Sequence, residues 1–305
     1  MATDKKVLLV DFIKSGVAAL ESIYPTAEAR SIVLILCEFL IGTKSYTHLV
    51  EPAFVIPASK IGLLEEGMDR LKRGEPIQYV TGRAEFCGLS FKVNDNVLIP
   101  RPETELLCRK AITLGSRIYR MRIPYGKKAE PVRILDLCTG SGCIAWKMAL
   151  SVPGARVVAT DISEEALGVA RSQEFSAELR EAGAEAPKFI RADVLQEAPA
   201  LDFDQFDLVL SNPPYIMESE IHLLRKNVLD FEPASALFVK DEDPLVFYRA
   251  IAHWSQKLMS PEGFGMTEIN ELLGPQTEEV FRSAGFQTEL VKDFYDKKRF
   301  IFYHK

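Results

Sequence analysis

The segment Asn212-Pro213-Pro214-Tyr215 follows the mainly apolar run 206–210 after a single residue, Ser211. Neither proline carries a backbone N–H and both have a fixed φ, so this backbone enters a sheet or helix poorly and its carbonyl groups stay free to accept hydrogen bonds. We expect the side-chain oxygen of Asn212 and the carbonyl of Pro213 to accept the two N–H groups of a planar amide or amino group, on which Tyr215 stacks. A plain turn is the alternative, because Asn-Pro and Pro-Pro are common turn dipeptides.

A nitrogen held in this way can receive a methyl group. An amide or amino nitrogen spreads its lone pair into its own π system, so the site must hold both hydrogens and direct the lone pair at the methyl carbon. No nucleophilic side chain and no strong base are needed. The segment therefore predicts N-methyl transfer, with Asn212, Pro213 and Tyr215 as catalytic residues and residues 212–215 as the substrate-binding segment.

A glycine-rich turn lies upstream, between the apolar run 132–137 and a predicted helix. Its residues are Cys138, Thr139, Gly140, Ser141 and Gly142. Glycine lets the backbone approach a ligand closely and adopt positive φ at little cost. Asp161 follows the next apolar run, about twenty residues later, where a carboxylate can accept hydrogen bonds from ribose hydroxyls. The turn and the carboxylate together predict a ligand that carries adenosine.

Asp193 and Val194 follow the third apolar run and are expected at the adenine end of the site, with the carboxylate accepting from the exocyclic amine and Val194 packing on the ring. A solvated loop is the alternative for Asp193. The glycine spacing also satisfies the dinucleotide fingerprint, so a nicotinamide dehydrogenase remains open. A dehydrogenase gives residues 212–215 no role, and the two motifs together favour S-adenosylmethionine as the cofactor.

Strand-like runs and helical periodicity alternate from residue 132 onward. The expected strands are 132–137, 156–160, 188–191, 206–210, 263–269, 287–292 and 299–303, and the expected helices are 142–151, 164–182, 244–259 and 274–284. This alternation predicts an α/β fold, a doubly wound Rossmann-like sheet of seven strands whose two final strands form an antiparallel edge. Both motifs then lie at the carboxyl edge, where open α/β sheets bind ligands.

The residues before 132 have a different pattern. Helices are expected over 7–24, 27–40 and 58–73, followed by a β-hairpin within 85–99 that turns at Asn94-Asp95-Asn96. A further helix is expected to end near residue 118, with Glu103 or Thr104 as its cap. We therefore expect a small helical domain over 1–74, a linker with the hairpin over 75–100 and a methyltransferase domain over 101–305.

Composition narrows the choice of partners. The 37 basic and 43 acidic residues give a net charge of −6, which is not the basic surface that holds nucleic acid through its phosphates. The five cysteines form no C-x-x-C pair and the four histidines have no metal-ligand spacing, so we expect reduced thiols and no metal. No apolar stretch reaches the roughly 20 residues of a membrane span, and no signal sequence is evident. We expect a cytoplasmic monomer.

The chain closely resembles the HemK/PrmC family, the methyltransferases that modify the glutamine of the Gly-Gly-Gln motif in peptide chain release factors. Besides residues 212–215, the resemblance rests on Glu75-Pro76-Ile77-Gln78-Tyr79 with Gly82, on Glu85-Phe86 with Gly88 and Phe91, and on the run 97–105, Val-Leu-Ile-Pro-Arg-Pro-Glu-Thr-Glu. This approach segment is the specific part, because DNA adenine and ribosomal RNA guanine N-methyltransferases share only the Asn-Pro-Pro-Tyr segment.

The resemblance implies roles for individual residues. Residues 138–142, Asp161 and Val194 correspond to cofactor contacts, Asn212 touches both cofactor and substrate, and residues 212–215 form the glutamine pocket. Phe86 and residues 101–105 form a wall beside that pocket, with helix capping and hairpin packing as the alternative. The loop 231–237 is substrate-side or solvated. Cys138 and Asn270 stand where the family usually has glycine.

Two alternatives to release-factor methylation remain at this point. Methylation of adenine or guanine in nucleic acid would require a basic track near the site, for which Arg117, Arg120, Arg122, Lys127 and Lys128 are the candidates. A solvated linker is the simpler interpretation of these charges. A non-enzymatic adaptor that binds an adenosine ligand would have no use for an intact Asn212-Pro213-Pro214-Tyr215 segment.

Overall fold

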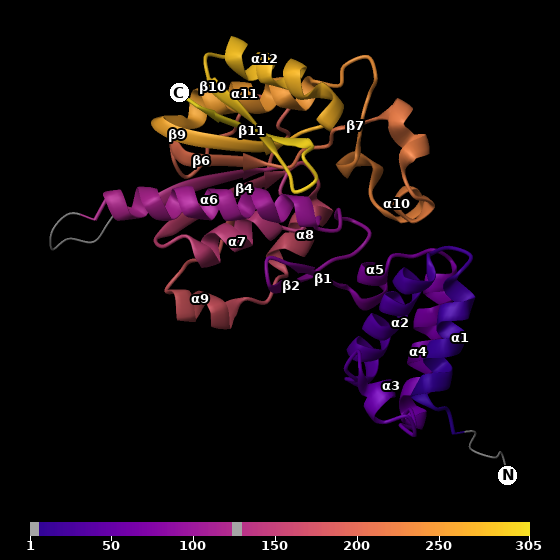
Figure 1. The fold of residues 1–305 in the computed structure, drawn as a ribbon. Helices are drawn as coiled ribbons and strands as arrows, with labels where there is room; N and C mark the ends of the chain where they lie inside the picture. The colour runs from indigo at the N-terminus through magenta and orange to yellow at the C-terminus, as the bar shows by residue number, and fades with distance from the viewer. Residues whose placement is uncertain (1–5, 124–129) are drawn as a thin grey trace. The chain divides into compact units, whose positions relative to one another are not determined.

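The computed structural model describes residues 6–123 and 130–305, which form two compact units (Figure 1). Of the described residues, 6–83 and 225–231 form the first unit, and 84–123, 130–224 and 232–305 form the second. The segment 225–231 lies inside the range 101–305 that the sequence pattern assigns to the methyltransferase domain. None of the helices in the described parts of the chain combines the length and the apolar character that a membrane span needs.

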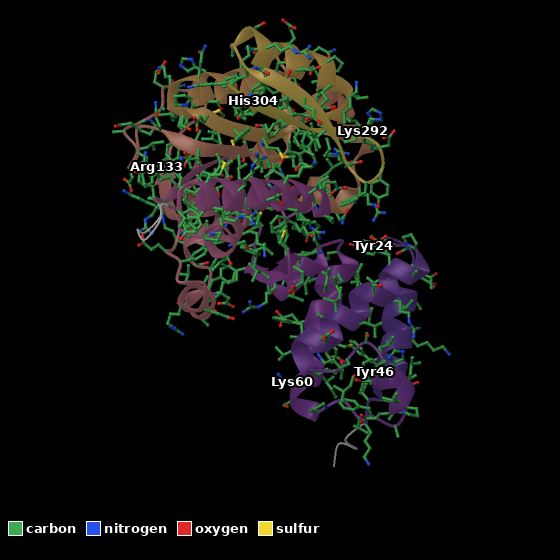
Figure 2. All side chains as sticks on the ribbon, turned by 60° about the vertical axis from the view of Figure 1, so that its left-hand side comes forward. Tyr24, Tyr46, Lys60, Arg133, Lys292 and His304 are labelled. Carbon is green, nitrogen blue, oxygen red and sulfur yellow. The ribbon has the colours of Figure 1, made fainter. Side chains whose placement is uncertain are left out.

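The first unit is helical. Its helices are α1 (Leu9–Leu20), α2 (Thr26–Ile41), α3 (Thr47–Val50), α4 (Ala58–Lys72), α5 (Ile77–Thr81) and α10 (Lys226–Phe231). Leu20, Val33, Leu36 and Leu71 are among the buried side chains of its core. Other apolar side chains of this unit stay exposed, among them Tyr46 at 57% (Figure 2).

A β-hairpin begins the second unit, formed by β1 (Arg83–Phe86) and β2 (Leu89–Lys92). Its turn is Cys87-Gly88, with φ of 50° and 76°, and not the expected Asn94-Asp95-Asn96. A two-residue hairpin turn of type I′ needs positive φ at both positions, and the sequence Cys-Gly signals this only through its glycine. The asparagine-rich segment instead forms a separate exposed turn, in which the side-chain oxygen of Asn94 accepts from the N–H of Asn96.

Seven strands of the described chain form one sheet in the order β10-β11-β9-β6-β3-β4-β5. They are β3 (Val132–Leu137), β4 (Ala155–Asp161), β5 (Lys188–Arg191), β6 (Phe206–Ser211), β9 (Met259–Glu268), β10 (Gln287–Lys292) and β11 (Lys298–His304). Strands β5, β4, β3, β6 and β9 are parallel, and β11 runs antiparallel to both β9 and β10. The doubly wound sheet with an antiparallel edge is confirmed.

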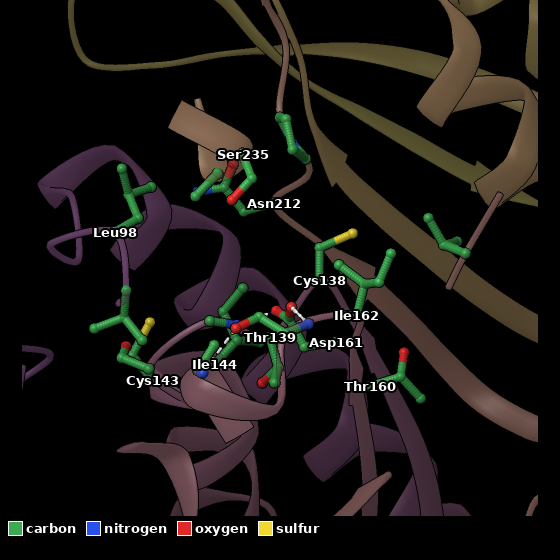
Figure 3. A pocket seen from close by; sticks show the side chains of 18 of the residues that line it. Leu98, Cys138, Thr139, Cys143, Ile144, Thr160, Asp161, Ile162, Asn212 and Ser235 are labelled. Carbon is green, nitrogen blue, oxygen red and sulfur yellow. Dashed lines mark hydrogen bonds between the residues drawn. The ribbon is translucent and has the colours of Figure 1, made fainter. Parts of the chain in front are cut away.

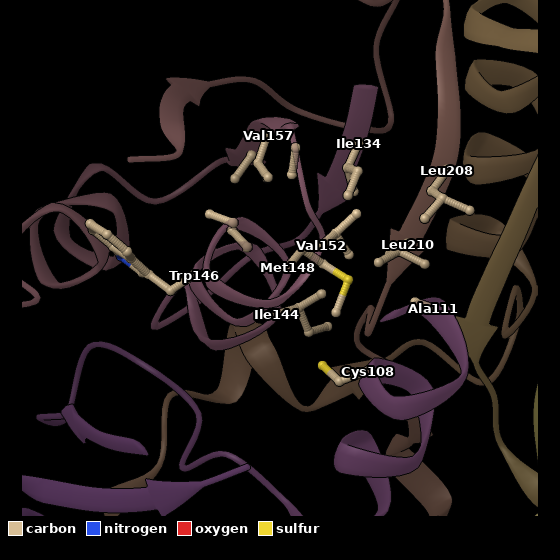
Figure 4. Packing of buried hydrophobic residues seen from close by; sticks show 14 of the residues in the cluster. Cys108, Ala111, Ile134, Ile144, Trp146, Met148, Val152, Val157, Leu208 and Leu210 are labelled. Atoms are coloured by element: carbon tan, nitrogen blue, oxygen red, sulfur yellow. The ribbon is translucent and has the colours of Figure 1, made fainter. Parts of the chain in front are cut away.

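Helices cover both faces of the sheet, which separates two cores. They are α6 (Pro102–Met121), α7 (Cys143–Ser151), α8 (Glu164–Arg171), α9 (Ser176–Ala182), α11 (Val246–Leu258) and α12 (Gly274–Ser283). On one face, Ile134 and Leu208 pack with Met148 of α7 and with Val152, which directly follows that helix (Figure 4). On the other face, Leu135 and Val209 pack with the α11 residue Trp254. Alternate residues of each central strand thus enter opposite cores.

The expected helix 164–182 is two helices, α8 and α9, separated by residues 172–175. The side chain of Gln173 explains the break, because it makes long-range hydrogen bonds that a continuous helix would misdirect. Its oxygen accepts from the N–H of Lys92 over 2.8 Å, and its nitrogen donates to the carbonyls of Lys92 and Ser141 over 2.9 and 3.2 Å. Gln173 therefore ties the hairpin strand β2 to the glycine-rich turn.

The remaining elements lie between β6 and α11, or follow β9. They are β7 (Ile216–Met217), η1 (Glu218–Leu223), η2 (Ala234–Ala236), β8 (Phe238–Val239) and η3 (Glu271–Leu273). Strand order reverses between β3 and β6, each of which ends at the same edge of the sheet. Arg133, at the start of β3, marks the opposite edge (Figure 2). The reversal creates the crevice in which α/β sheets bind ligands.

Candidate active site

A cavity of about 280 Å³ lies at this strand reversal (Figure 3). Residues after β3 form one part of its wall and residues after β6 form another. Of the residues predicted to bind cofactor or substrate, those that line it are Cys138, Thr139, Gly140, Ser141, Asp161, Asp193, Val194, Asn212 and Pro214, and Arg101 and Thr104 of the predicted wall 101–105 line it too. The described residues that line it do not include Gly142, Pro213, Tyr215 or Phe86. The glycine-rich turn and the asparagine segment therefore face one shared space.

The glycine-rich turn has three residues in the left-handed region, Cys138, Gly140 and Gly142, with φ of 60°, 55° and 79°. A Cβ on Gly140 would meet no atom of the described residues within 4 Å, so its open side leaves room for a ligand. A Cβ on Gly142 would lie 3.0 Å from Ala170 and 3.1 Å from Trp146, so this glycine serves helix packing. Cys138 accepts a conformation that favours glycine, and burial raises the pKa of its thiol well above the usual range.

Asp161 ends β4 and its carboxylate is hydrogen-bonded to the backbone on two sides. Oδ2 accepts from the N–H of Gly140 over 2.9 Å, and Oδ1 accepts from the N–H of Ser163 over 3.0 Å. Burial raises the pKa of the Asp161 carboxyl, and these two hydrogen bonds oppose the rise. The carboxylate is thereby fixed in the cavity wall beside the turn, with lone pairs left for a ligand's hydroxyls.

A second carboxylate, Asp136, lies under the turn and was not singled out from the sequence. Its Oδ2 accepts from the Thr139 hydroxyl over 2.6 Å and from the N–H of Ala145 over 3.1 Å. Within the described residues its Oδ1 is buried without a hydrogen-bond partner. Burial raises the pKa of Asp136 to about 7, against the hydrogen bonds from Thr139 and Ala145. An acidic residue inside the apolar run 132–137 was the signal for it.

Apolar side chains form part of the cavity lining, and the group Ile162, Val194, Leu195 and Phe247 is called the apolar slot below. Asp193 also lines the cavity, and its Oδ1 accepts from the N–H of Leu195 over 2.9 Å. The lining therefore includes apolar side chains that suit a flat ring and a carboxylate that can accept hydrogen bonds. Both residues expected at the adenine end are therefore in the cavity wall.

Asn212 follows β6 directly and its amide is held from one side. Its Nδ2 donates to the Thr104 hydroxyl over 3.2 Å, and that hydroxyl donates to Oε2 of Glu268 over 2.7 Å. Thr104 was expected as a helix cap, but α6 starts earlier, with Arg101 as N-cap and Pro102 in its first turn. The Thr104 side chain is thus free to contact β9. In the view of Figure 3, Asn212 and Ser235 lie above Thr139 and Asp161.

Tyr215 lies at the end of the same segment. Its hydroxyl donates to Oε1 of Glu268 over 2.9 Å, and burial together with that carboxylate raises the pKa of the phenol well above its usual range. The same Glu268 therefore contacts both Thr104 and Tyr215. Burial raises the pKa of Glu268, and the hydrogen bonds from Thr104 and Tyr215 oppose the rise.

Phe86 occupies the protein core. It is 1% exposed and packs edge-on against Phe91, with ring centroids 6.0 Å apart. The alternating burial of β1 points Phe86 at the core shared with α6 and α7. The position of Phe86 therefore agrees with the hairpin-packing alternative: its side chain packs in the core.

The loop 231–237 reaches the cavity through Ser235 and Ala236. Glu232 anchors the part of the loop next to them: its Oε1 accepts from the Arg101 guanidinium over 2.6 Å and its Oε2 accepts from the N–H of Ile99 over 3.1 Å. Glu232 is 5% exposed, so this part of the loop is not solvated. Arg101 also lines the cavity and is held in its wall by this ion pair.

Two family models match parts of the chain. Residues 103–230 match the methyltransferase small domain, and residues 11–82 match the PrmC N-terminal domain. A solved methyltransferase from Pyrococcus furiosus is 14% identical, with a TM-score of 0.47, over 78% of this chain and 98% of that one. The release factor glutamine methyltransferase of Bacteroides thetaiotaomicron is 36% identical over 93% of this chain and 95% of that protein. The chain belongs to the release factor glutamine methyltransferase family. The protein of the same name from Flavobacterium psychrophilum is 37% identical over 97% of this chain and 98% of its own length.

In this member of the release factor glutamine methyltransferase family, Asn270 connects the end of β9 to the segment 212–215. Its side-chain nitrogen donates to the carbonyl of Tyr215 over 3.1 Å and to Oε2 of Glu220 over 2.7 Å, and its oxygen accepts from the N–H of Leu272. A glycine would make none of these side-chain contacts. The sequence marked the position only as a departure from the family pattern.

The proposed basic track does not form one free surface. Arg122 makes a two-point ion pair with Asp207, over 2.8 and 2.6 Å, and also donates to the carbonyl of Pro131. Arg117 and Arg120 are exposed, and Lys127 and Lys128 lie outside the described residues. Arg122 is therefore committed to a carboxylate that is 5% exposed.

Proposed function

We propose that this protein transfers the methyl group of S-adenosylmethionine to the side-chain amide nitrogen of the glutamine in the Gly-Gly-Gln motif of peptide chain release factors. The observation that carries the proposal is that the turn residues 138–141 and Asn212 line the same cavity. Membership in the release factor glutamine methyltransferase family supports the choice of substrate. We further propose that the protein acts as a cytoplasmic monomer, because its substrate is a translation factor.

The cavity fits S-adenosylmethionine in three respects. The open side of Gly140 admits a ligand close to the backbone, the fixed Asp161 carboxylate offers acceptors to ribose hydroxyls, and the slot beside Val194 and Phe247 is apolar enough for adenine. Asp193 in the cavity lining would accept from the adenine amine. Bound there, the cofactor supplies an electrophilic methyl group on a sulfonium.

Asn212 and Pro213 would hold the glutamine nitrogen. Asn212 donates through Nδ2 to Thr104, which leaves its Oδ1 as the acceptor for one N–H of the substrate. The carbonyl of Pro213 would accept the other N–H, since no strand or helix uses it. Both hydrogen bonds strengthen as positive charge develops on the nitrogen, which is how they lower the barrier.

Tyr215 would close the pocket by packing against the planar amide. Its hydroxyl is fixed on Glu268, so the ring has one orientation available to it. The stacked ring fixes the tilt of the amide and excludes water from the nitrogen. Pro214, which lines the cavity, would form the neighbouring wall.

The direct test is the mass of a release-factor peptide after incubation with the protein and S-adenosylmethionine. We expect a gain of one methyl group, located by fragmentation on the glutamine of the Gly-Gly-Gln motif. Asn212→Ala should abolish the gain while S-adenosylmethionine still binds. Methylation of DNA or ribosomal RNA with no methylation of release factor, or full activity in Asn212→Ala, would contradict the proposal.

A further inference from the structure

A short chain of buried hydrogen bonds runs from Glu268 through Thr104 to Asn212. Oε2 of Glu268 accepts from the Thr104 hydroxyl over 2.7 Å, and the same hydroxyl oxygen accepts from Nδ2 of Asn212 over 3.2 Å. Glu268 is 1% exposed and Thr104 is 2% exposed, so bulk water does not compete for these contacts. The chain begins at the last residue of β9, passes through the first turn of α6 and ends in the cavity wall.

In this chain of hydrogen bonds, the donor and the acceptor of each bond are fixed by the chemistry of the groups. An ionised carboxylate accepts hydrogen bonds and cannot donate. The single hydroxyl proton of Thr104 is therefore given to Glu268, and the hydroxyl can only accept from its other neighbour. That neighbour must present an N–H, so the amide of Asn212 turns its nitrogen to Thr104 and its oxygen away from it.

The opposite orientation of Asn212 has nearly the same shape. Turned by half a rotation, the amide would present Nδ2 to the substrate, and two N–H groups would face each other. The nitrogen to be methylated would then lose the acceptor that holds its hydrogen and directs its lone pair. Packing alone distinguishes these two orientations poorly, since the oxygen and NH₂ groups are similar in size.

We propose that Glu268 is a positioning residue that sets the donor and acceptor sides of Asn212 through the Thr104 hydroxyl. The inference rests on the proposed function, because it assigns Asn212 Oδ1 to the substrate amide. The second carboxylate oxygen of Glu268 holds the Tyr215 hydroxyl over 2.9 Å, so one buried group orients both ends of the Asn212-Pro213-Pro214-Tyr215 segment.

The contacts of Glu268 favour this role over a purely structural one. Burying a carboxylate costs stability unless it is well paired, and an apolar residue of similar volume often serves a core better. The nearby Arg299 directs its guanidinium hydrogen bonds to Asp293 and Glu271 over 3.2 and 3.4 Å. The hydrogen bonds that Glu268 accepts through its side chain come from Thr104 and Tyr215, both of which adjoin the site.

Glu268→Gln should exchange the donors and acceptors along the hydrogen bonds that link residue 268, Thr104 and Asn212. If the new NH₂ group faced Tyr215, the phenol proton would lose its acceptor in a buried position. If it faces Thr104, the hydroxyl can turn and donate to Oδ1 of Asn212, which satisfies every group but turns Nδ2 of Asn212 toward the substrate. The second arrangement is favoured, because a buried unpaired donor is costly.

The experiment measures kcat, KM for release factor and the Kd of S-adenosylmethionine in four proteins: unaltered, Thr104→Val, Glu268→Gln and the double variant. We expect Thr104→Val to lower kcat by roughly 10- to 100-fold, with KM and Kd changed by less than about threefold. Glu268→Gln should lower kcat by roughly 10-fold or more when Thr104 is present. In the Thr104→Val background, Glu268→Gln should lower kcat little further, because the chain of hydrogen bonds from Glu268 to Asn212 is already broken.

Two further variants make the test specific. Thr104→Ser retains the hydroxyl and should recover most of the turnover that Thr104→Val loses. Thr113→Val removes an exposed hydroxyl from the same helix, where it donates to the carbonyl of Arg109 over 3.0 Å, and should leave kcat unchanged. If Thr104→Val does not fold, as judged by cofactor binding, Thr104→Ala takes its place.

Failure of the inference and failure of the proposed function give different results. If the unaltered protein does not methylate release factor, the proposed function fails. If the unaltered protein does methylate release factor, but kcat of Thr104→Val is within about threefold of its value, the proposed positioning role of Glu268 is wrong. Equal effects of Glu268→Gln in both Thr104 backgrounds would likewise overturn it, since a purely structural contribution adds independently.

Discussion

The carboxylate of Asp161 accepts a hydrogen bond from the backbone N–H of Gly140 over 2.9 Å. The residue expected to bind ribose therefore also fixes the turn expected to receive the rest of the ligand. Because the other carboxylate oxygen holds the N–H of Ser163, Asp161 also supports the start of α8. The cofactor side of the cavity is thus organised before any ligand arrives, which reduces the entropy lost on binding.

Asp161→Ala should therefore weaken cofactor binding in two ways, by removing the acceptor for ribose and by releasing the Gly140 turn. Hydrogen bonds to a charged group contribute about 1.5–3 kcal/mol, so we expect the Kd of S-adenosylmethionine to rise roughly 10- to 100-fold. Calorimetric titration measures this directly. Glu164→Gln, at an exposed position in α8, is the control and should leave Kd unchanged. An unaltered Kd in Asp161→Ala would remove Asp161 from the site.

Phe86 allows the core interpretation to be tested against the pocket-wall hypothesis. Because the ring is 1% exposed, Phe86→Ala should lower the free energy of unfolding by about 3–5 kcal/mol, and Phe86→Leu by less. In Phe86→Leu we expect KM for release factor to remain unchanged. Urea denaturation and steady-state kinetics provide the two measurements. Phe39→Leu, at a position 47% exposed, is the matched control. A higher KM in Phe86→Leu without loss of stability would restore the pocket-wall role.

The fold was predictable from local pattern because each central strand is buried on both faces. Such strands read as continuous apolar runs, and the glycine-rich turn and Asn212 follow two of them directly. The carboxyl ends of neighbouring parallel strands meet at one edge, so the shared cavity could be expected from strand order alone. The break between α8 and α9 could not, because it depends on Gln173 reaching Lys92, 81 positions away.

Within the site, the sequence pattern did not indicate the hydrogen bonds between residues that are far apart along the chain. Thr104 and Glu268 are 164 positions apart, and Tyr215 and Glu268 are 53 apart. Nothing in the local sequence of either segment indicates that they meet. Polar residues at the ends of apolar runs were the available signal: Glu268 ends the strand β9 and Asp136 interrupts β3. Such residues are costly in a core unless they are paired, and these two accept hydrogen bonds from Tyr215 and Thr139, in the loops after β6 and β3.

Substitution of Arg122 tests whether this basic residue before β3 binds nucleic acid or stabilises the folded protein. Its partner Asp207 is 5% exposed and also accepts from the N–H of Arg133, so removing the guanidinium leaves a buried carboxylate without its main partner. We expect Arg122→Ala to lower the free energy of unfolding by about 3 kcal/mol, the low end for a buried pair, because Arg122 itself is 32% exposed.

The matched control is Arg117→Ala, an exposed arginine of α6, the helix that ends just before Arg122, and we expect a change within about 0.5 kcal/mol. Thermal and urea denaturation of both variants measure the difference. Neither variant should change a weak, salt-dependent affinity for duplex DNA. Loss of tight DNA binding in both variants, with stability intact, would instead support the nucleic-acid hypothesis.

Asp136 should make stability depend on pH near neutrality. Burial raises the pKa of the Asp136 carboxyl from its usual value near 4 to about 7 in the folded protein, so the folded state binds this proton more tightly than the unfolded state. The contribution of the protonated Asp136 carboxyl to the free energy of unfolding is fully present below about pH 4. It is lost as the pH rises to about 7, and the loss is as much as about 4 kcal/mol. Burial raises the pKa values of Asp161 and Glu268 too, which adds to the loss with the same sign.

Urea denaturation at intervals between pH 5 and pH 8 measures this dependence. Asp136→Asn keeps an acceptor for Thr139 but cannot titrate, so its free energy of unfolding should fall less steeply with pH than that of the unaltered protein. The exposed Asp95→Asn controls for the loss of one carboxylate and should reproduce the unaltered slope. Parallel curves for the unaltered protein and Asp136→Asn would show that the buried carboxyl already titrates in its ordinary range.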